Sequence, residues 1–290
     1  MSFGKDLSLE FKKLANGGHY GEVELFTKLQ DALINLRSSK YGYEIDLIHG
    51  SRSQVQFVNN STWVTGIAPG STQQCELADM MFIVFSDAKK QIRLMYMQNK
   101  NGDTSSWSFS ADLVQLHLLK ARREITSPAL PACVFNDRGI LADALLPSVA
   151  SYGVFYKHNN DTEMAYYPAS NLTPLHSTGT MNARVTRFNR SFFRNLRTIS
   201  GYEESQGEEF LWDFGDRLID MQIGTPILPG TAAYSELVRC LRDHSQSFRD
   251  TELYRQIMGN NPTLDDKQFR GDGLPFVCII NADEAAKVSQ

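Results

Sequence analysis

The chain has 290 residues, enough for one large domain or two modest ones with a buried core. Hydrophobic residues make up 42% and charged residues 21%, as in ordinary globular proteins. The formal net charge of −4 gives no overall basic signal for nucleic acid, so any contact with DNA or RNA would use a local patch.

Membrane insertion, export and a zinc or disulfide framework are not indicated by the sequence. No apolar run approaches the roughly 18–20 residues of a membrane span. The first residues, MSFGKDLSLEF, lack the apolar core of a signal peptide. Four cysteines stand far apart without C-x-x-C spacing. We therefore expect a cytoplasmic protein with no membrane partner.

The first strong helix is expected over residues 20–37, after a short amphipathic helix at 5–16 that Asn16-Gly17-Gly18 interrupts. Its apolar stripe falls at helical spacing, and Glu22 stands at the head of that stripe. A carboxylate at this position can simply favour the helix N-terminus through the dipole, which is one reading of Glu22.

A β-hairpin follows two short strands, at 43–48 and 55–58, and a loop at 67–74. Its strands are Met80 to Phe85 and Ile92 to Met97, separated by a polar turn. In an antiparallel hairpin the start of one strand lies beside the end of the other, so Asp79, Gln98 and Lys100 should converge. Carboxylate and amide oxygens are ligands that Mg²⁺ accepts, and a lysine beside them can steady a phosphate. The alternative is an ordinary hairpin with a charged end.

A turn is expected at 101–103, followed by a helix over 111–124 that Ser110 would cap. Gln115 and His117 lie among the leucines of its apolar stripe. Lys120 belongs to the basic C-terminal end of this helix, where it complements the helix dipole and could also contact phosphates.

The stretch TSPALP at 126–131 reads as a linker. It marks either a domain boundary between 1–125 and 126–290 or only a crossing loop. The second part is expected to hold a hairpin at 152–156 and 164–167, helices at 208–221, 234–245 and 251–258, a buried strand at 274–281 and a fraying polar tail. It carries no catalytic motif that we recognise. We expect it to be a mainly helical region that binds a partner or nucleic acid, or that packs as one unit with the first part.

The most basic piece of the chain runs from Asn182 to Ile199, where arginines at spacings of three to four would share one helical face. Arginines interleaved with phenylalanines suit phosphate contacts and base stacking. The alternative is a helix that docks its phenylalanines in the core and pairs its arginines with the acids at 203, 204, 208 and 209. The arginines concerned are Arg184, Arg187, Arg190, Arg194 and Arg197.

The segment Glu76-Leu77-Ala78-Asp79, followed by Gln98-Asn99-Lys100, resembles the motif of the PD-(D/E)xK nuclease superfamily in its Q-x-K form. The resemblance covers roughly residues 10–125. It implies a restriction-endonuclease-like α+β (α/β) fold, a mixed central sheet flanked by helices. It also implies Mg²⁺ or Mn²⁺ held by Asp79, Gln98 and Glu22, with Lys100 activating water. Gln115 matches a glutamine that such folds often carry on the helix after the hairpin.

From this resemblance we expect a metal-dependent endonuclease that cleaves DNA, of the kind that bacteria use in restriction or antiphage defence. Such enzymes often work under a regulatory or sensor protein and often form homo-oligomers. The sequence does not separate DNA from RNA. The alternative is a nuclease-like fold that serves as a non-catalytic nucleic-acid-binding or protein-binding subunit of a defence complex, which the acidic balance of the chain favours.

Overall fold

The computed structural model of the chain describes residues 2–39, 41, 44–46, 54–60, 68–103, 108–125, 139–158, 161–174, 182–186, 196–207, 209–260 and 276–288. The expected linker at 126–131 lies outside these residues, as do Arg187, Arg190 and Arg194 of the basic stretch.

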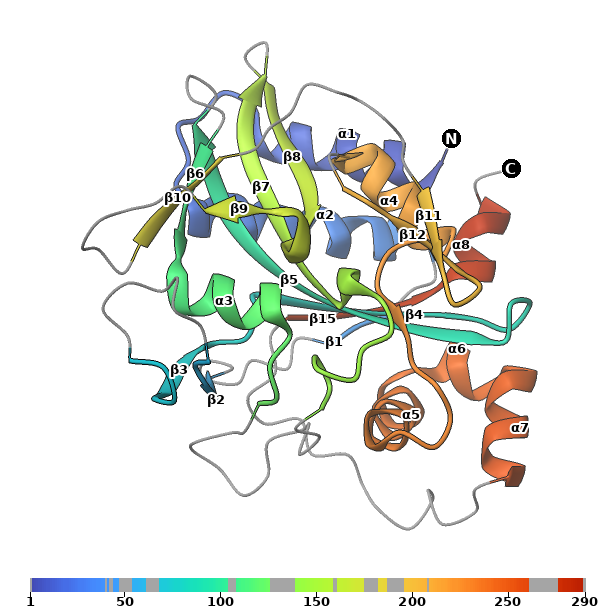
Figure 1. Ribbon diagram of the computed structural model, residues 1–290. Helices are drawn as coiled ribbons and strands as arrows, with labels where there is room; N and C mark the ends of the chain where they lie inside the picture. The colour runs from blue at the N-terminus through green and yellow to red at the C-terminus, as the bar shows by residue number, and fades with distance from the viewer. Residues whose placement is uncertain are drawn as a thin grey trace.

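The protein is a mixed α+β structure with a central mixed sheet flanked by helices (Figure 1). The helices are α1 Phe3–Ala15, α2 Glu22–Ser39, α3 Leu113–Ala121, α4 Leu211–Ile219, α5 Ala232–His244, α6 Gln246–Arg249, α7 Glu252–Asn260 and α8 Ala282–Val288. The strands are β1 Glu44–Asp46, β2 Gln54–Val58, β3 Thr72–Glu76, β4 Met80–Ser86, β5 Gln91–Asp103, β6 Ser108–Asp112, β7 Ala150–His158, β8 Asp161–Pro168, β9 Thr173–Pro174, β10 Asn182–Thr186, β11 Leu196–Ile199, β12 Tyr202–Ser205, β13 Glu209–Phe210, β14 Thr225–Pro226 and β15 Phe276–Asn281.

The expected hairpin of β4 and β5 is confirmed, and it forms the middle of the sheet. The two strands pair antiparallel from Met80 opposite Met97 to Ser86 opposite Gln91. Every residue of β4 is buried, because both faces of the sheet are covered. Alternate residues of β4 pack into two separate cores, Met81 and Ile83 into one and Met80 and Phe82 into the other.

The sheet draws strands from both parts of the chain. β7 pairs parallel with β5, and β8 continues from β7 as the expected hairpin. On the other side, β15 lies between β1 and β4 and pairs parallel with β4. Residues after 126 therefore help to build the same sheet as the residues before it. Within the described residues the second part is a mixture of strands and helices, not mainly helical as the sequence suggested.

Helices cover the two faces of the sheet in distinct groups. Apolar residues of α1, α2, α4 and α8 belong to one core, while those of α3, α5, α6 and α7 belong to the other (Figure 1). Helix α2 starts at Glu22, where the Glu24 carboxylate accepts a hydrogen bond from the Gly21 N–H at 2.9 Å. Of the helices that the structure describes, none has both the length and the apolar character needed to cross a bilayer.

Three local predictions near the hairpin are wrong. A loop was expected at 67–74, but strand β3 begins at Thr72. The residues of β3 are mostly polar and show no apolar alternation. The turn expected at 101–103 is the end of β5, where Gly102 pairs with Phe109 of β6. Ser110 lies within β6, and α3 is instead capped by Asp112, whose carboxylate accepts a hydrogen bond from the Gln115 N–H at 2.9 Å.

Two predictions for the second part are also wrong. The described ends of the basic stretch are strands, since β10 pairs with β6 and β11 pairs with β12. Pairing between distant segments here overrides the helical spacing of the arginines. The tail does not fray: α8 follows β15 directly, and the Asp283 carboxylate accepts hydrogen bonds from the Ser86 hydroxyl and the Asp87 N–H, both at 2.7 Å.

We predict that Gly4→Ala destabilises the fold by about 1–3 kcal/mol, because α1 and α4 touch backbone to backbone at this point. A Cβ atom on Gly4 would lie 1.7 Å from the carbonyl oxygen of Trp212, and one on Gly215 would lie 2.6 Å from the Cα of Gly4. Urea unfolding measures the change in the free energy of unfolding. Gly259→Ala in α7 is the control: apart from the neighbouring backbone of its own helix, no atom lies within 4 Å of the added Cβ, so this substitution should be neutral or stabilising. Equal stability of the Gly4 variant and the wild type would contradict the close helix contact.

Candidate functional site

The hairpin brings Asp79 and Gln98 into direct contact at one end of the sheet. Asp79 immediately precedes β4, and its N–H donates to the carbonyl of Met97 at 3.2 Å. The side-chain amide of Gln98 donates to Oδ2 of Asp79 at 2.8 Å, and the N–H of Asn99 donates to the same oxygen at 2.6 Å. The convergence expected from the hairpin is therefore present, with Asp79 held by two donors from β5.

Gln115 of α3 extends this contact into a chain of hydrogen bonds. Its Nε2 donates to Oε1 of Gln98 at 2.7 Å and to the backbone carbonyl of Glu76 at 2.9 Å. Gln98 and Gln115 are both buried, which strengthens these bonds and fixes the two amide groups relative to Asp79. Asp112, which caps α3, sets the position of Gln115 along the helix.

Lys100 and Glu22 form an ion pair at the edge of the same site. The Lys100 Nζ donates to Oε1 of Glu22 at 2.8 Å, and the N–H of Asn101 donates to Oε2 at 3.3 Å. The side chain of Lys100 is 16% exposed and that of Glu22 is 39% exposed. The structure thus brings Glu22 to the hairpin, as the resemblance implied. It also places Glu22 in the first turn of α2, where the helix dipole favours a carboxylate.

The Asp79 carboxyl group is difficult to ionise in this setting. Burial raises its pKa above the ordinary value of 3.8, and the negative charge of Glu22 acts in the same direction. The hydrogen bond from the Asn99 N–H, the charge of Lys100 and the hydrogen bond from Gln98 oppose the shift without cancelling it. A positive charge close to Asp79 would stabilise the ionised form.

A divalent metal ion matches the chemistry of the donor atoms here. Asp79, Glu22 and the Gln98 carbonyl offer hard oxygen ligands, and Mg²⁺ often uses one or two carboxylates and keeps several waters. No cluster of three or more His, Cys, Asp or Glu side chains arranged for a metal occurs in the described part of the chain. Asp79 and Glu22 would be the charged ligands, and Gln98 could supply its oxygen only by leaving Gln115.

Tyr152 is a neighbour of the site that the sequence did not reveal. In β7 it pairs with Gln98, and it is fully buried. Its hydroxyl has no hydrogen-bond partner among the described residues. Burial raises its pKa well above the usual value, and the charges of Cys75, Asp112, Asp79 and Glu22 add to the shift. Tyr152 could not be found from sequence, because nothing local specifies which strand lies beside β5.

Cys75 lies close to the same acidic groups and is not an activated nucleophile. Burial raises the pKa of its thiol to about 12, with Asp112 and Glu76 adding to the effect. The Cys75 thiol therefore remains protonated at neutral pH.

Of the cationic residues proposed for nucleic-acid binding, the structure describes the side chains of Lys120 and Arg197 and the strand position of Arg184. The Lys120 ammonium group donates to the backbone carbonyls of Ser170 and Leu172. The Arg197 guanidinium group forms an ion pair with the buried carboxylate of Glu204, at 2.6 Å from Nε. Arg184 lies in β10, opposite Ser110 of β6. Of the four acids that the alternative interpretation named, Glu204 pairs with Arg197.

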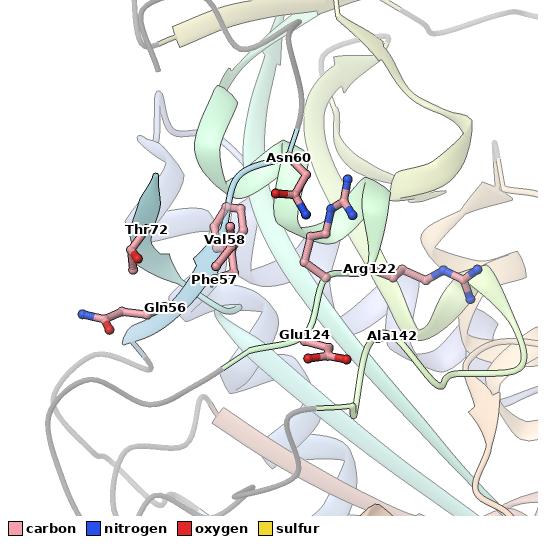
Figure 2. Close-up of a pocket in the computed structure, with 9 residues that line it drawn as sticks. Gln56, Phe57, Val58, Asn60, Thr72, Arg122, Glu124 and Ala142 are labelled. Carbon is pink, nitrogen blue, oxygen red and sulfur yellow. The ribbon is translucent and has the colours of Figure 1, made fainter. Parts of the chain in front are cut away.

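A separate cavity lies beside the C-terminal end of α3 and strands β2 and β3 (Figure 2). Its volume is about 750 Å³. Arg122 and Arg123 line it together with Glu124 and the polar side chains of Asn60 and Thr72. The Nε–H of Arg123 is buried and donates no hydrogen bond within the described residues.

Protein-family models, curated proteins and solved structures give no match to this chain.

We predict that Asp79→Asn leaves the fold at least as stable as the wild type at pH 7.5. The charge of buried Asp79 opposes folding at pH values above its raised pKa, and asparagine removes that charge. Both hydrogen bonds to Asp79 end on Oδ2, which the amide oxygen can replace. The difference in melting temperature between variant and wild type should shrink as the pH falls below the raised folded-state pKa, and it is lost below 3.8, where the wild-type carboxyl group becomes protonated in the unfolded state as well.

Melting curves from pH 4 to pH 8 test this prediction. A variant that is less stable than the wild type at pH 7.5, with the gap closing at low pH, would show that the Asp79 charge stabilises the fold.

Proposed function

We propose that this protein is a metal-dependent nuclease that hydrolyses phosphodiester bonds in nucleic acid, with DNA as the expected substrate. The observation that carries the proposal is the convergence of Asp79, Gln98 and Lys100 at one end of the hairpin, with Glu22 reaching Lys100 from α2. Carboxylate and amide oxygens beside a lysine are the groups that phosphodiester hydrolysis with a divalent metal requires.

Each residue has a distinct part in this proposal. Asp79, Gln98 and Glu22 would hold Mg²⁺ or Mn²⁺, which supplies a water of lowered pKa and neutralises charge on the phosphate. Lys100 would orient the attacking water and stabilise the developing charge on phosphate oxygens. Its side chain is mostly buried and already held in place by Glu22, so little ordering is needed when substrate binds.

The topology around the hairpin also supports the proposal. Helix α3 follows the hairpin and carries Gln115 to the site, and β7 then returns parallel to β5 beside Gln98. A helix before the hairpin, a hairpin with the site residues and a helix after it make up the arrangement that the resemblance to PD-(D/E)xK nucleases implies. A role in restriction or antiphage defence, under a sensor protein and in a homo-oligomer, is part of the same proposal.

A second candidate function is a nuclease-like fold that binds without cutting. The observation in its favour is that Gln98, Lys100 and Glu22 are all engaged by other protein groups. Such a protein would contact nucleic acid or a protein partner with its surface and would be indifferent to changes in these residues.

We predict that Lys100→Met lowers metal-dependent cleavage about 100-fold or more, since it removes the positive charge next to Asp79. The melting temperature should change little, because an ion pair with a partly exposed partner adds about 0–1 kcal/mol. Plasmid cleavage with Mg²⁺ or Mn²⁺, in parallel with melting curves, measures both effects.

Lys90→Met is the matched control for this substitution. Lys90 stands at the opposite end of the same hairpin and also forms an ion pair, with Asp87 at 2.8 Å. Its loss should leave cleavage unchanged. Equal cleavage by the Lys100 and Lys90 variants would place the chemistry elsewhere, and no cleavage by any of the three proteins would favour the binding function.

We predict that Arg123→Gln weakens binding of a DNA oligonucleotide about threefold to tenfold near 0.1 M salt. The change should also reduce the salt dependence of binding by about one counterion, as expected for the loss of one phosphate contact. Arg255→Gln, on exposed α7, is the control. Fluorescence anisotropy at several salt concentrations is the measurement, and equal slopes for both variants would remove the cavity from the nucleic-acid surface.

A further inference from the structure

The hydrogen bonds of Gln98 and Gln115 satisfy the polar groups of the site from within the protein. Gln98 places its NH₂ group on Asp79 and its carbonyl oxygen on the NH₂ group of Gln115, and Gln115 also donates to the Glu76 carbonyl. The NH₂ group of each glutamine therefore faces an acceptor, and the Gln98 oxygen faces a donor. A buried carboxylate that receives two donors within 2.8 Å has part of its charge compensated without a cation.

The charges of the site also leave little negative charge that a cation would have to compensate. Glu22 and Lys100 compensate each other at 2.8 Å, which leaves Asp79 as the remaining negative charge. An acidic residue at position 98 would add a second carboxylate next to Asp79, and two such groups need a proton or a cation between them. Glutamine at this position removes that need. The attraction of the protein alone for a divalent cation is correspondingly weak.

We propose that the site binds its divalent cation strongly only together with a phosphodiester group of the substrate, and that Gln98 and Gln115 enforce this order. The inference rests on the proposed function and adds the way in which the site is regulated. The phosphate brings the second negative charge and an additional oxygen ligand that the glutamine does not provide. Gln98 then gives up its hydrogen bonds with Gln115 and Asp79 and binds the cation and the phosphate instead.

The exchange has a definite cost in hydrogen bonds. For Oε1 of Gln98 to reach a cation beside Asp79, its bond from Gln115 must break, and its NH₂ group must leave Oδ2 of Asp79. Buried donors left without a partner raise the free energy of the site. When the cation binds alone, its own binding free energy must offset the lost hydrogen bonds. When a phosphate binds with it, the binding free energies of both ligands offset the loss. By thermodynamic reciprocity, the cation then strengthens nucleic-acid binding by the same factor as the nucleic acid strengthens cation binding.

The first arm of the test uses the cation alone and needs no activity. Melting temperatures of wild type, Gln98→Glu and Gln91→Glu are measured in EDTA and in increasing Ca²⁺ or Mg²⁺. Gln91→Glu adds the same charge to the same strand at its far end, opposite Ser86. We expect Gln98→Glu to melt below the wild type in EDTA and to gain about 3 °C or more with the cation, while the other two proteins gain little.

The second arm adds nucleic acid to the wild type. Ca²⁺ binding is measured by calorimetry with and without a short DNA duplex, and duplex binding with and without Ca²⁺. We expect at least about a tenfold tighter cation affinity in the presence of the duplex, and an equal gain for the duplex in the presence of Ca²⁺.

The two arms separate failure of this inference from failure of the proposed function. An unchanged cation response of Gln98→Glu overturns the part assigned to the glutamines, and equal Ca²⁺ affinity with and without bound duplex overturns the coupling. If no nucleic acid binds under any condition while Gln98→Glu gains its cation response, the proposed function fails and the role of Gln98 stands.

Discussion

The parallel pairing of β15 with β4 is the constraint on which the rest of the structure depends. It places a strand from near the end of the chain in the middle of the sheet, with β1 on its other side. The N–H of Phe276 donates to the carbonyl of Asp79 at 3.0 Å, so this strand also fixes the backbone of the central site residue. Because β4 and β15 are buried on both faces, a shift of either strand by one residue would exchange the side chains of the two cores and disturb the packing of both.

The polar groups of the site are stable in this apolar setting because they are paired in two sets. Asp79 is joined to Gln98 and through it to Gln115, and Lys100 is joined to Glu22. The first set is buried and carries the directional hydrogen bonds, whereas the second is partly exposed and carries opposite charges. The same low dielectric that makes Asp79 costly to ionise makes each remaining contact in the site stronger.

Sequence reasoning recovered what local patterns specify. The β4–β5 hairpin and the helix that brings Glu22 follow from apolar periodicity and turn residues, and the meeting of Asp79 with Gln98 follows from hairpin geometry. Tyr152 could not be predicted, because its place beside Gln98 depends on a parallel register between strands far apart in the chain. The arginine spacing at 182–199 suggested a helix for the same reason: the pairing of β10 with β6 is not visible locally.

The position of β15 has a consequence for the synthesis of the protein. The β4–β5 hairpin leaves the ribosome well before the strand that completes the sheet. At about 5–20 residues per second, roughly 180 residues of further translation take on the order of 10–40 s. During that interval the apolar edge of β4 has no neighbour on one side and is open to pairing with other chains or to capture by a chaperone. The carbonyl of Asp79 gains its hydrogen bond from the Phe276 N–H only when this delay ends, so the backbone around the site is completed when translation is nearly finished.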